Sequence, residues 1–131
     1  EARSLISDKM EIQVKKMETA FQEAAQKMGG SVQFHSEVMY PGFKFNEEDL
    51  VVQIAKQAVT SIGRTPRLLQ SGGGSDANII AGFGIPTVNL AVGYEEIHTT
   101  NEKMPIKELV KTAELVVAIA ETVAKHKKTL R

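Results

Sequence analysis

The sequence contains no cysteine, which excludes disulfide cross-links and thiolate metal sites. It also lacks an excess of charge, because 16 basic side chains balance 16 acidic ones, so charge gives no reason to expect a nucleic-acid or membrane partner. No apolar run approaches the roughly 20 residues that a membrane-spanning helix needs. Hydrophobic residues make up 42% of the 131 residues, a share typical of a folded globular protein. Together these features favour a cytoplasmic protein with a modest core.

Apolar periodicity predicts an α/β architecture. Apolar residues recur at steps of three and four within residues 10–28, 50–62 and 109–123, as on one face of a helix. For the last of these helices, the predicted buried stripe is Leu109, Ala113, Val116, Ala120 and Val123. Strands are predicted at residues 1–6, 32–40, 65–70 and 85–92, and the last is apolar enough to be buried on both faces. Because the chain opens within a strand pattern, we interpret it as a piece of a longer protein.

A turn at Pro41-Gly42 is the candidate domain boundary, since proline and glycine together break regular structure. The part before it, residues 1–42, has a β-α-β pattern. The part after it, residues 43–131, alternates helices with apolar strands. We therefore predict two structural parts that meet at this turn.

A glycine-rich loop at residues 71–78 is the first candidate site. Gly72, Gly73 and Gly74 allow the backbone to approach another group closely, and Ser75 or Asp76 can cap the short apolar helix that follows. The free N–H groups at the start of that helix could face an anion, such as a peptide carboxylate or a developing oxyanion. The loop matches neither common nucleotide-binding glycine motif. A plain tight strand-to-helix connection explains the same residues equally well.

Three side chains outside this loop are further candidates. His98 follows an apolar strand, where ligands usually bind in α/β sheets, and it could be a metal ligand, a general base or a surface residue. Glu102 could orient the imidazole or merely cap the last helix. Arg3 could recognise a carboxylate through its guanidinium, or it could be an ordinary exposed residue. The sequence contains no further cluster with the spacing of metal ligands.

In their order along the chain, several motifs resemble the C-terminal part of the zinc exopeptidases related to peptidase T, carboxypeptidase G and the aminoacylases. The motifs are Glu1-Ala2-Arg3-Ser4, Tyr40-Pro41-Gly42-Phe43, Gly72-Gly73-Gly74-Ser75-Asp76-Ala77-Asn78, Gly84-Ile85-Pro86-Thr87-Val88-Asn89-Leu90 and His98-Thr99-Thr100-Asn101-Glu102. The resemblance runs nearly end to end. Its glycine loop looks most similar to that of peptidase T-like members.

The resemblance implies an α/β catalytic domain that holds two zinc ions, with a smaller lid, or dimerisation domain, inserted into it. Residues 1–42 would be the second half of the lid, and residues 43–131 would be the C-terminal half of the catalytic domain. His98 would be a zinc ligand, and Arg3 would grip a substrate carboxylate. Gly73, Gly74, Ser75 and Asp76 would line the substrate pocket. A water between the two zinc ions would attack the scissile carbonyl, while a glutamate upstream of this chain would take its proton.

The same resemblance predicts that this chain alone is inactive, because the other metal ligands and the general base would lie in a missing N-terminal part. The expected function of the complete protein is hydrolysis of amide bonds in short peptides, as in a tripeptide aminopeptidase. One alternative is an N-acyl amino acid deacylase or carboxypeptidase of the same family. Another is a non-enzymatic module that forms a homodimer through the lid half.

Overall fold

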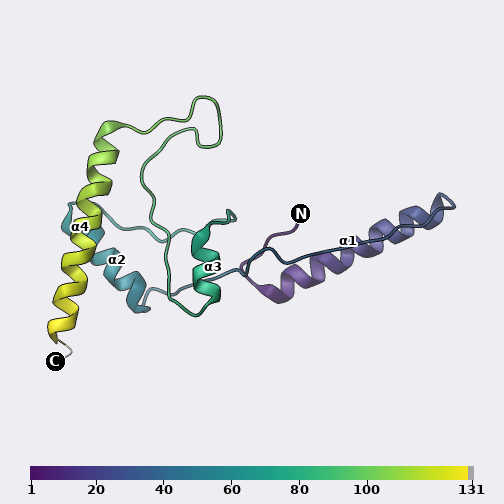
Figure 1. Ribbon diagram of the computed structural model, residues 1–131, viewed down its shortest axis with the longest axis horizontal. Helices are drawn as coiled ribbons and strands as arrows, with labels where there is room; N and C mark the ends of the chain where they lie inside the picture. Colours follow the sequence, from purple (N-terminus) through teal and green to yellow (C-terminus); the bar gives the residue numbers. More distant parts are fainter. Residues whose placement is uncertain (130–131) are drawn as a thin grey trace. The chain divides into compact units, whose positions relative to one another are not determined.

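The computed structural model describes residues 1–129. This part of the chain contains the helices α1 (Ser7–Lys27), α2 (Leu50–Ser61), α3 (Asp76–Gly82) and α4 (Ile106–Thr129), shown in Figure 1. The three longer helices correspond to the three stretches of helical periodicity. The short helix α3 follows Ser75, as the capping pattern predicts. Within residues 1–129, none of the helices combines the length and apolarity that a membrane crossing needs.

Extended segments stand where strands are predicted. Across residues 1–129, β pairing is limited to one isolated antiparallel bridge between Glu95 and Lys103, so the predicted sheet is not confirmed. A strand is defined by hydrogen bonds to a neighbouring strand, and these segments do not pair with one another. The alternation of apolar residues therefore indicates extended backbone, but it cannot supply the neighbour that a sheet requires.

The chain divides into two compact units, and neither unit is continuous in sequence. Unit 1 consists of Glu1–Lys44 and Gln70–Thr87, and unit 2 consists of Phe45–Leu69 and Val88–Arg131. The glycine loop and α3 thus belong to the same unit as α1. The His98 loop belongs to the unit that contains α2 and α4.

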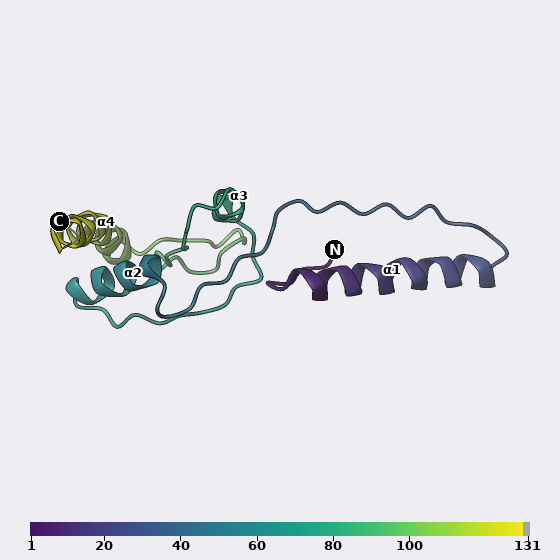
Figure 2. The same cartoon turned by 90° about the horizontal axis from the view of Figure 1, so that it is seen from below.

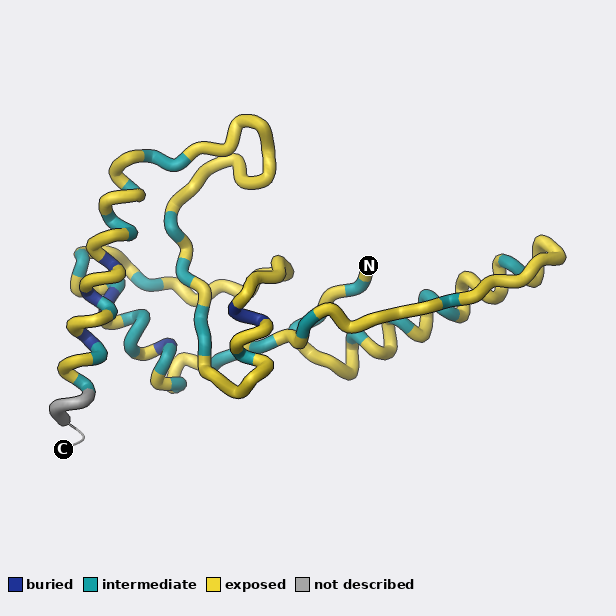
Figure 3. Tube along the Cα trace, in the orientation of Figure 1, coloured by how far each residue is buried: buried dark blue, intermediate teal, exposed yellow. Residues whose placement is uncertain are grey.

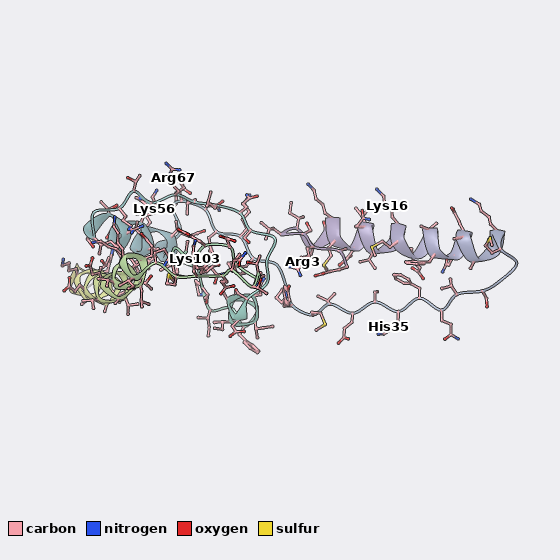
Figure 4. The ribbon with its side chains drawn as sticks, turned by 90° about the horizontal axis from the view of Figure 1, so that it is seen from above. Arg3, Lys16, His35, Lys56, Arg67 and Lys103 are labelled. Atoms are coloured by element: carbon pink, nitrogen blue, oxygen red, sulfur yellow. The ribbon has the colours of Figure 1, made fainter. Side chains whose placement is uncertain are left out.

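In unit 1, an extended segment at residues 30–39 runs beside α1, as Figure 2 shows. The rings of Phe21 on the helix and Phe34 on the segment lie 5.8 Å apart between centroids, a separation typical of interacting aromatic pairs. No residue of α1 is buried. Lys16 projects from the side of α1 away from the segment, and His35 points away from the helix (Figure 4).

Unit 2 has a small core between α2 and α4. Ala58 on α2 is fully buried against Leu115 and Ala118 on α4, and Figure 3 shows the buried positions where these helices meet. Partly buried hydrophobic residues surround them: Val59, Ile62, Leu90 and Ile119. Because small side chains meet at this contact, the two helices can approach closely.

The predicted buried stripe of α4 is wrong. Leu109 and Val116 are 58% and 64% exposed, whereas Leu115, Ala118 and Thr122 are buried. The helix carries apolar residues on two different faces, and both faces satisfy the steps of three and four. Periodicity alone could not select the face that packs on α2.

Candidate functional site

The predicted site residues fall into two groups. Arg3 and the glycine loop lie in unit 1, and His98 lies in unit 2. Each group has its own local geometry.

Arg3 contacts the glycine loop. Its Nη1 donates a hydrogen bond to the carbonyl oxygen of Gly72 at 2.9 Å, although the two residues are 69 positions apart. The guanidinium also pairs with the carboxylate of Glu1, and this pairing lowers the pKa of Glu1 and raises that of Arg3. The side chain of Arg3 remains 48% exposed and is labelled in Figure 4. Arg3 is therefore positioned at the loop, where a guanidinium could also meet a bound carboxylate.

The glycine loop passes against Tyr40. A Cβ added at Gly74 would overlap the ring and hydroxyl of Tyr40, so only glycine fits at this position without a shift of the aromatic side chain. The amide of Gly73 donates to Oγ of Ser71 at 3.1 Å, which adds a local turn. Tyr40 thus contacts the loop in a way that sequence reasoning missed, since no local pattern reveals a contact 34 residues away.

Ser75 and Asn78 form a reciprocal capping box at the start of α3. The amide of Ser75 donates to Oδ1 of Asn78 at 3.0 Å, and Asp76 is the exposed first residue of the helix. Of the two predicted capping residues, Ser75 and Asp76, the structure shows Ser75 as the cap. The capping box uses main-chain N–H groups at the helix start. The anion-binding interpretation requires such groups to be free.

Asn78 links α3 to the turn at Pro41. Its Nδ2 donates to the carbonyl oxygen of Pro41 at 2.9 Å, and the residue is only 7% exposed. One side chain therefore satisfies both the cap and the turn. Sequence reasoning missed Asn78 because its position three residues after Ser75 indicates a local cap but gives no sign of the distant partner.

His98 lies in a compact loop whose base is closed by main-chain bonds. The amide of Glu95 donates to the carbonyl of Lys103 at 2.9 Å, and the amide of Lys103 donates to the carbonyl of Glu95 at 3.2 Å. The Lys103 ammonium lies 3.3 Å from the carboxylate of Glu95 and 3.8 Å from that of Glu96. The loop is thus held at its base without a contribution from His98.

The backbone of His98 is left-handed, with φ of 65°, and Glu96 has φ of 52°. Residues other than glycine adopt this region uncommonly, and such strained positions cluster at functional sites. Oε2 of Glu102 accepts a hydrogen bond from the main-chain N–H of His98 at 2.7 Å. The structure therefore connects Glu102 to the backbone of His98, whereas the sequence suggested a contact with the imidazole or a helix cap.

The chemistry of His98 suits one metal ligand, since it is an exposed imidazole and zinc commonly binds imidazole nitrogen. Among the described residues, however, no group of three or more histidine, cysteine or acidic side chains could hold a metal ion. Catalytic zinc sites typically use about three protein ligands. The described residues therefore fit a metal site only as the source of one ligand.

A surface hollow of about 380 Å³ lies on α1 and contains none of the predicted site residues. It is lined by Ile12, Lys15, Lys16, Thr19, Ala20 and Glu23. Every one of these side chains comes from the same helix. A hollow bounded by a single helix surface does not enclose a ligand in the way that binding pockets do.

Comparison with protein families and known sequences connects this geometry to one family. The model of peptidase family M20/M25/M40 matches residues 4–122. The chain is 68% identical over 125 residues to the uncharacterized protein YqjE of Bacillus subtilis. The aligned region covers 95% of this chain and 34% of YqjE. It is 40% identical over 81 residues to peptidase T of Clostridium botulinum. This aligned region covers 62% of this chain and 20% of that protein.

Two solved structures are similar as well. The aminopeptidase PepT from Bacillus cereus matches with a TM-score of 0.83 and 68% identity, over 92% of this chain and 32% of that one. A tripeptidase from Staphylococcus aureus matches with a TM-score of 0.88 and 45% identity, over 93% of this chain and 33% of that one. The chain thus spans about a third or less of the length of these relatives.

These matches confirm the family resemblance inferred from the motifs. The matched range includes helix α1, the glycine loop and the His98 loop, and it leaves out only short stretches at the two ends. The chain belongs to peptidase family M20/M25/M40.

Proposed function

We propose that the chain is part of a zinc-dependent aminopeptidase that cleaves short peptides. The observation that supports this proposal most strongly is the similarity to a PepT aminopeptidase and a tripeptidase, at TM-scores of 0.83 and 0.88 and identities of 68% and 45%. The family membership supports a peptidase, and the two named structures favour small peptides among the possible substrates.

His98 contributes one metal ligand in this proposal. Its exposed imidazole and its left-handed backbone in a closed loop suit a residue that presents a side chain outward. The remaining ligands and the general base come from the part of the protein outside this chain. The zinc, when bound, supplies an activated water.

Arg3 and the glycine loop contact the substrate in this proposal. The guanidinium lies at the Gly72 carbonyl, so a carboxylate bound by Arg3 would lie near Gly73, Gly74, Ser75 and Asp76. These residues provide main-chain groups and small side chains that leave room for a peptide. Arg3 carries the positive charge, and the loop shapes the surface around it.

The domain assignment also remains a proposal: residues 1–42 form the second half of the lid, and residues 43–131 form the C-terminal half of the catalytic domain. The bonds from Arg3 to Gly72 and from Asn78 to Pro41 join the two ends of the proposed lid half to the glycine loop. A movement of the lid would therefore act on the loop through these two contacts. The lid half is also the proposed surface for a homodimer.

Hydrolysis of a set of substrates by the full-length protein that contains this sequence tests the proposal. Tripeptides should be cleaved with added zinc, and cleavage should stop when the metal is chelated. Cleavage of N-acyl amino acids in place of tripeptides would assign the protein as a deacylase or carboxypeptidase. Failure on both substrate classes, together with a stable metal-free dimer, would favour a non-enzymatic dimerising module.

A further inference from the structure

We propose that Glu102 is a positioning residue that holds the backbone of His98 in its left-handed conformation, and so aims the imidazole. This inference rests on the proposed role of His98 as a metal ligand and deepens it. It assigns to Glu102 a contact with the main chain, where the sequence suggested a contact with the ring. The bond between Oε2 of Glu102 and the His98 amide, at 2.7 Å, carries the argument.

The conformation of His98 needs a specific stabilising contact. A φ of 65° places Cβ close to the following carbonyl, which L residues avoid. Histidine tolerates this region better than most side chains do, but it does not prefer it. A loop residue in such a state persists only when its surroundings hold it there.

Glu102 supplies this contact from within the same turn. Its amide donates to the carbonyl of Thr99 at 3.2 Å, which fixes the start of its own side chain. Its carboxylate then reaches back to the His98 amide. A carboxylate is a stronger acceptor for a main-chain N–H than a neutral oxygen is. Both the backbone and the side chain of Glu102 therefore define the turn that begins at His98.

The direction of the imidazole follows from φ. Rotation of His98 to an ordinary negative φ would swing its Cα–Cβ bond relative to the loop, whichever rotamer the ring adopts. Metal affinity depends on ligands that are already oriented, and loss of an orienting partner typically lowers it about 10-fold to 100-fold. The removal of the Glu102 carboxylate should therefore weaken zinc binding without removing a ligand.

The base of the loop is independent of the Glu102 side chain. The main-chain bonds between Glu95 and Lys103 and the ion pairs of Lys103 remain when Glu102 is changed. Variants at position 102 should therefore fold, and an effect of such a variant can be assigned to the turn. Asn101 provides the matched control, since it is an exposed residue of the same turn whose hydrogen bond uses its main-chain amide.

The test uses the full-length protein with zinc as the probe and two readouts. The first is the amide proton shift of His98 in a protein labelled with ¹⁵N-histidine, assigned by its loss in His98→Ala. The second is the zinc dissociation constant, measured by competition with a chelator. Glu102→Ala should move the amide proton upfield and weaken zinc about tenfold, at the lower end of the range for orienting residues. Glu102→Gln, which keeps an acceptor oxygen, should restore most of the amide shift and most of the zinc affinity, and Asn101→Ala should match the wild type in both.

The outcomes separate this inference from the proposed function. An unchanged amide shift in Glu102→Ala would show that the bond is not formed. A changed shift with unchanged zinc affinity would show that the bond does not position the ligand, and either result overturns the inference alone. Full zinc affinity and full activity in His98→Ala would overturn the ligand role itself, and the inference would fall with it.

Discussion

Replacement of Asn78 by alanine should destabilise the protein, although alanine is the better helix former. The side chain makes two hydrogen bonds, to the Pro41 carbonyl at 2.9 Å and from the Ser75 amide at 3.0 Å. Two bonds worth about 1 kcal/mol each net give a loss of about 2 kcal/mol. The helix propensity of alanine is more favourable than that of asparagine by about 0.6 kcal/mol, which offsets part of this loss. The free energy of unfolding should therefore fall by about 1.5 kcal/mol.

Urea unfolding followed by circular dichroism measures this difference directly. Asn101→Ala is the matched control, because the bond of Asn101 in the His98 loop uses its main-chain amide. That exposed substitution should stay within about 0.5 kcal/mol of the wild type. The reasoning would be refuted if Asn78→Ala were as stable as the wild type or more stable, since helix propensity would then outweigh both bonds.

Two further predictions concern the local contacts of each unit. Gly74→Ala should lower the free energy of unfolding by about 1–3 kcal/mol, because the added methyl group overpacks against Tyr40. Thermal unfolding should show that this loss disappears when Gly74→Ala is made in a Tyr40→Ala background. If the loss persisted in that background, Tyr40 would not be its cause. The Arg64 guanidinium lies 2.7 Å from the Glu108 carboxylate and lowers its pKa. The ion pair therefore contributes to stability above the ordinary carboxyl pKa, and this contribution is lost as the pH falls through the lowered pKa. Glu108→Gln should therefore flatten the acid side of a profile of stability against pH, and an unchanged profile would contradict the pairing.

The helices could be predicted from the sequence because their signals are local. Steps of three and four located α1, α2 and α4, and the two candidate caps Ser75 and Asp76 located the start of α3 to within one residue. The buried face of α4 could not be predicted in the same way. Leu109 and Leu115 lie on different faces of one helix that has apolar residues on both, and only the tertiary contact with Ala58 decides between them.

The extended segments show the same limit for the sheet. Residues 85–92 have the apolar composition of a buried strand, yet within residues 1–129 they find no strand partner. Strand pairing is a property of two segments, and a pattern in one of them cannot determine the other. The sheet therefore remains a prediction.

Motifs located the candidate site, but they did not give its contacts. The order of the glycine loop and the His98 loop indicated the family, which the comparisons confirmed. The partners of those loops were not visible in the sequence. Tyr40 at Gly74 and Pro41 at Asn78 are contacts between distant positions, and the Glu102 bond depends on a left-handed backbone that no spacing reveals.

The most direct measurement is the zinc content and tripeptide hydrolysis of the full-length protein beside its His98→Ala variant. His35→Ala is the matched control, because His35 is an exposed histidine on the extended segment of unit 1. The account predicts that His98→Ala loses bound zinc and hydrolysis together, while His35→Ala keeps both. Full zinc content and full hydrolysis in His98→Ala would contradict the claim that this chain supplies a metal ligand.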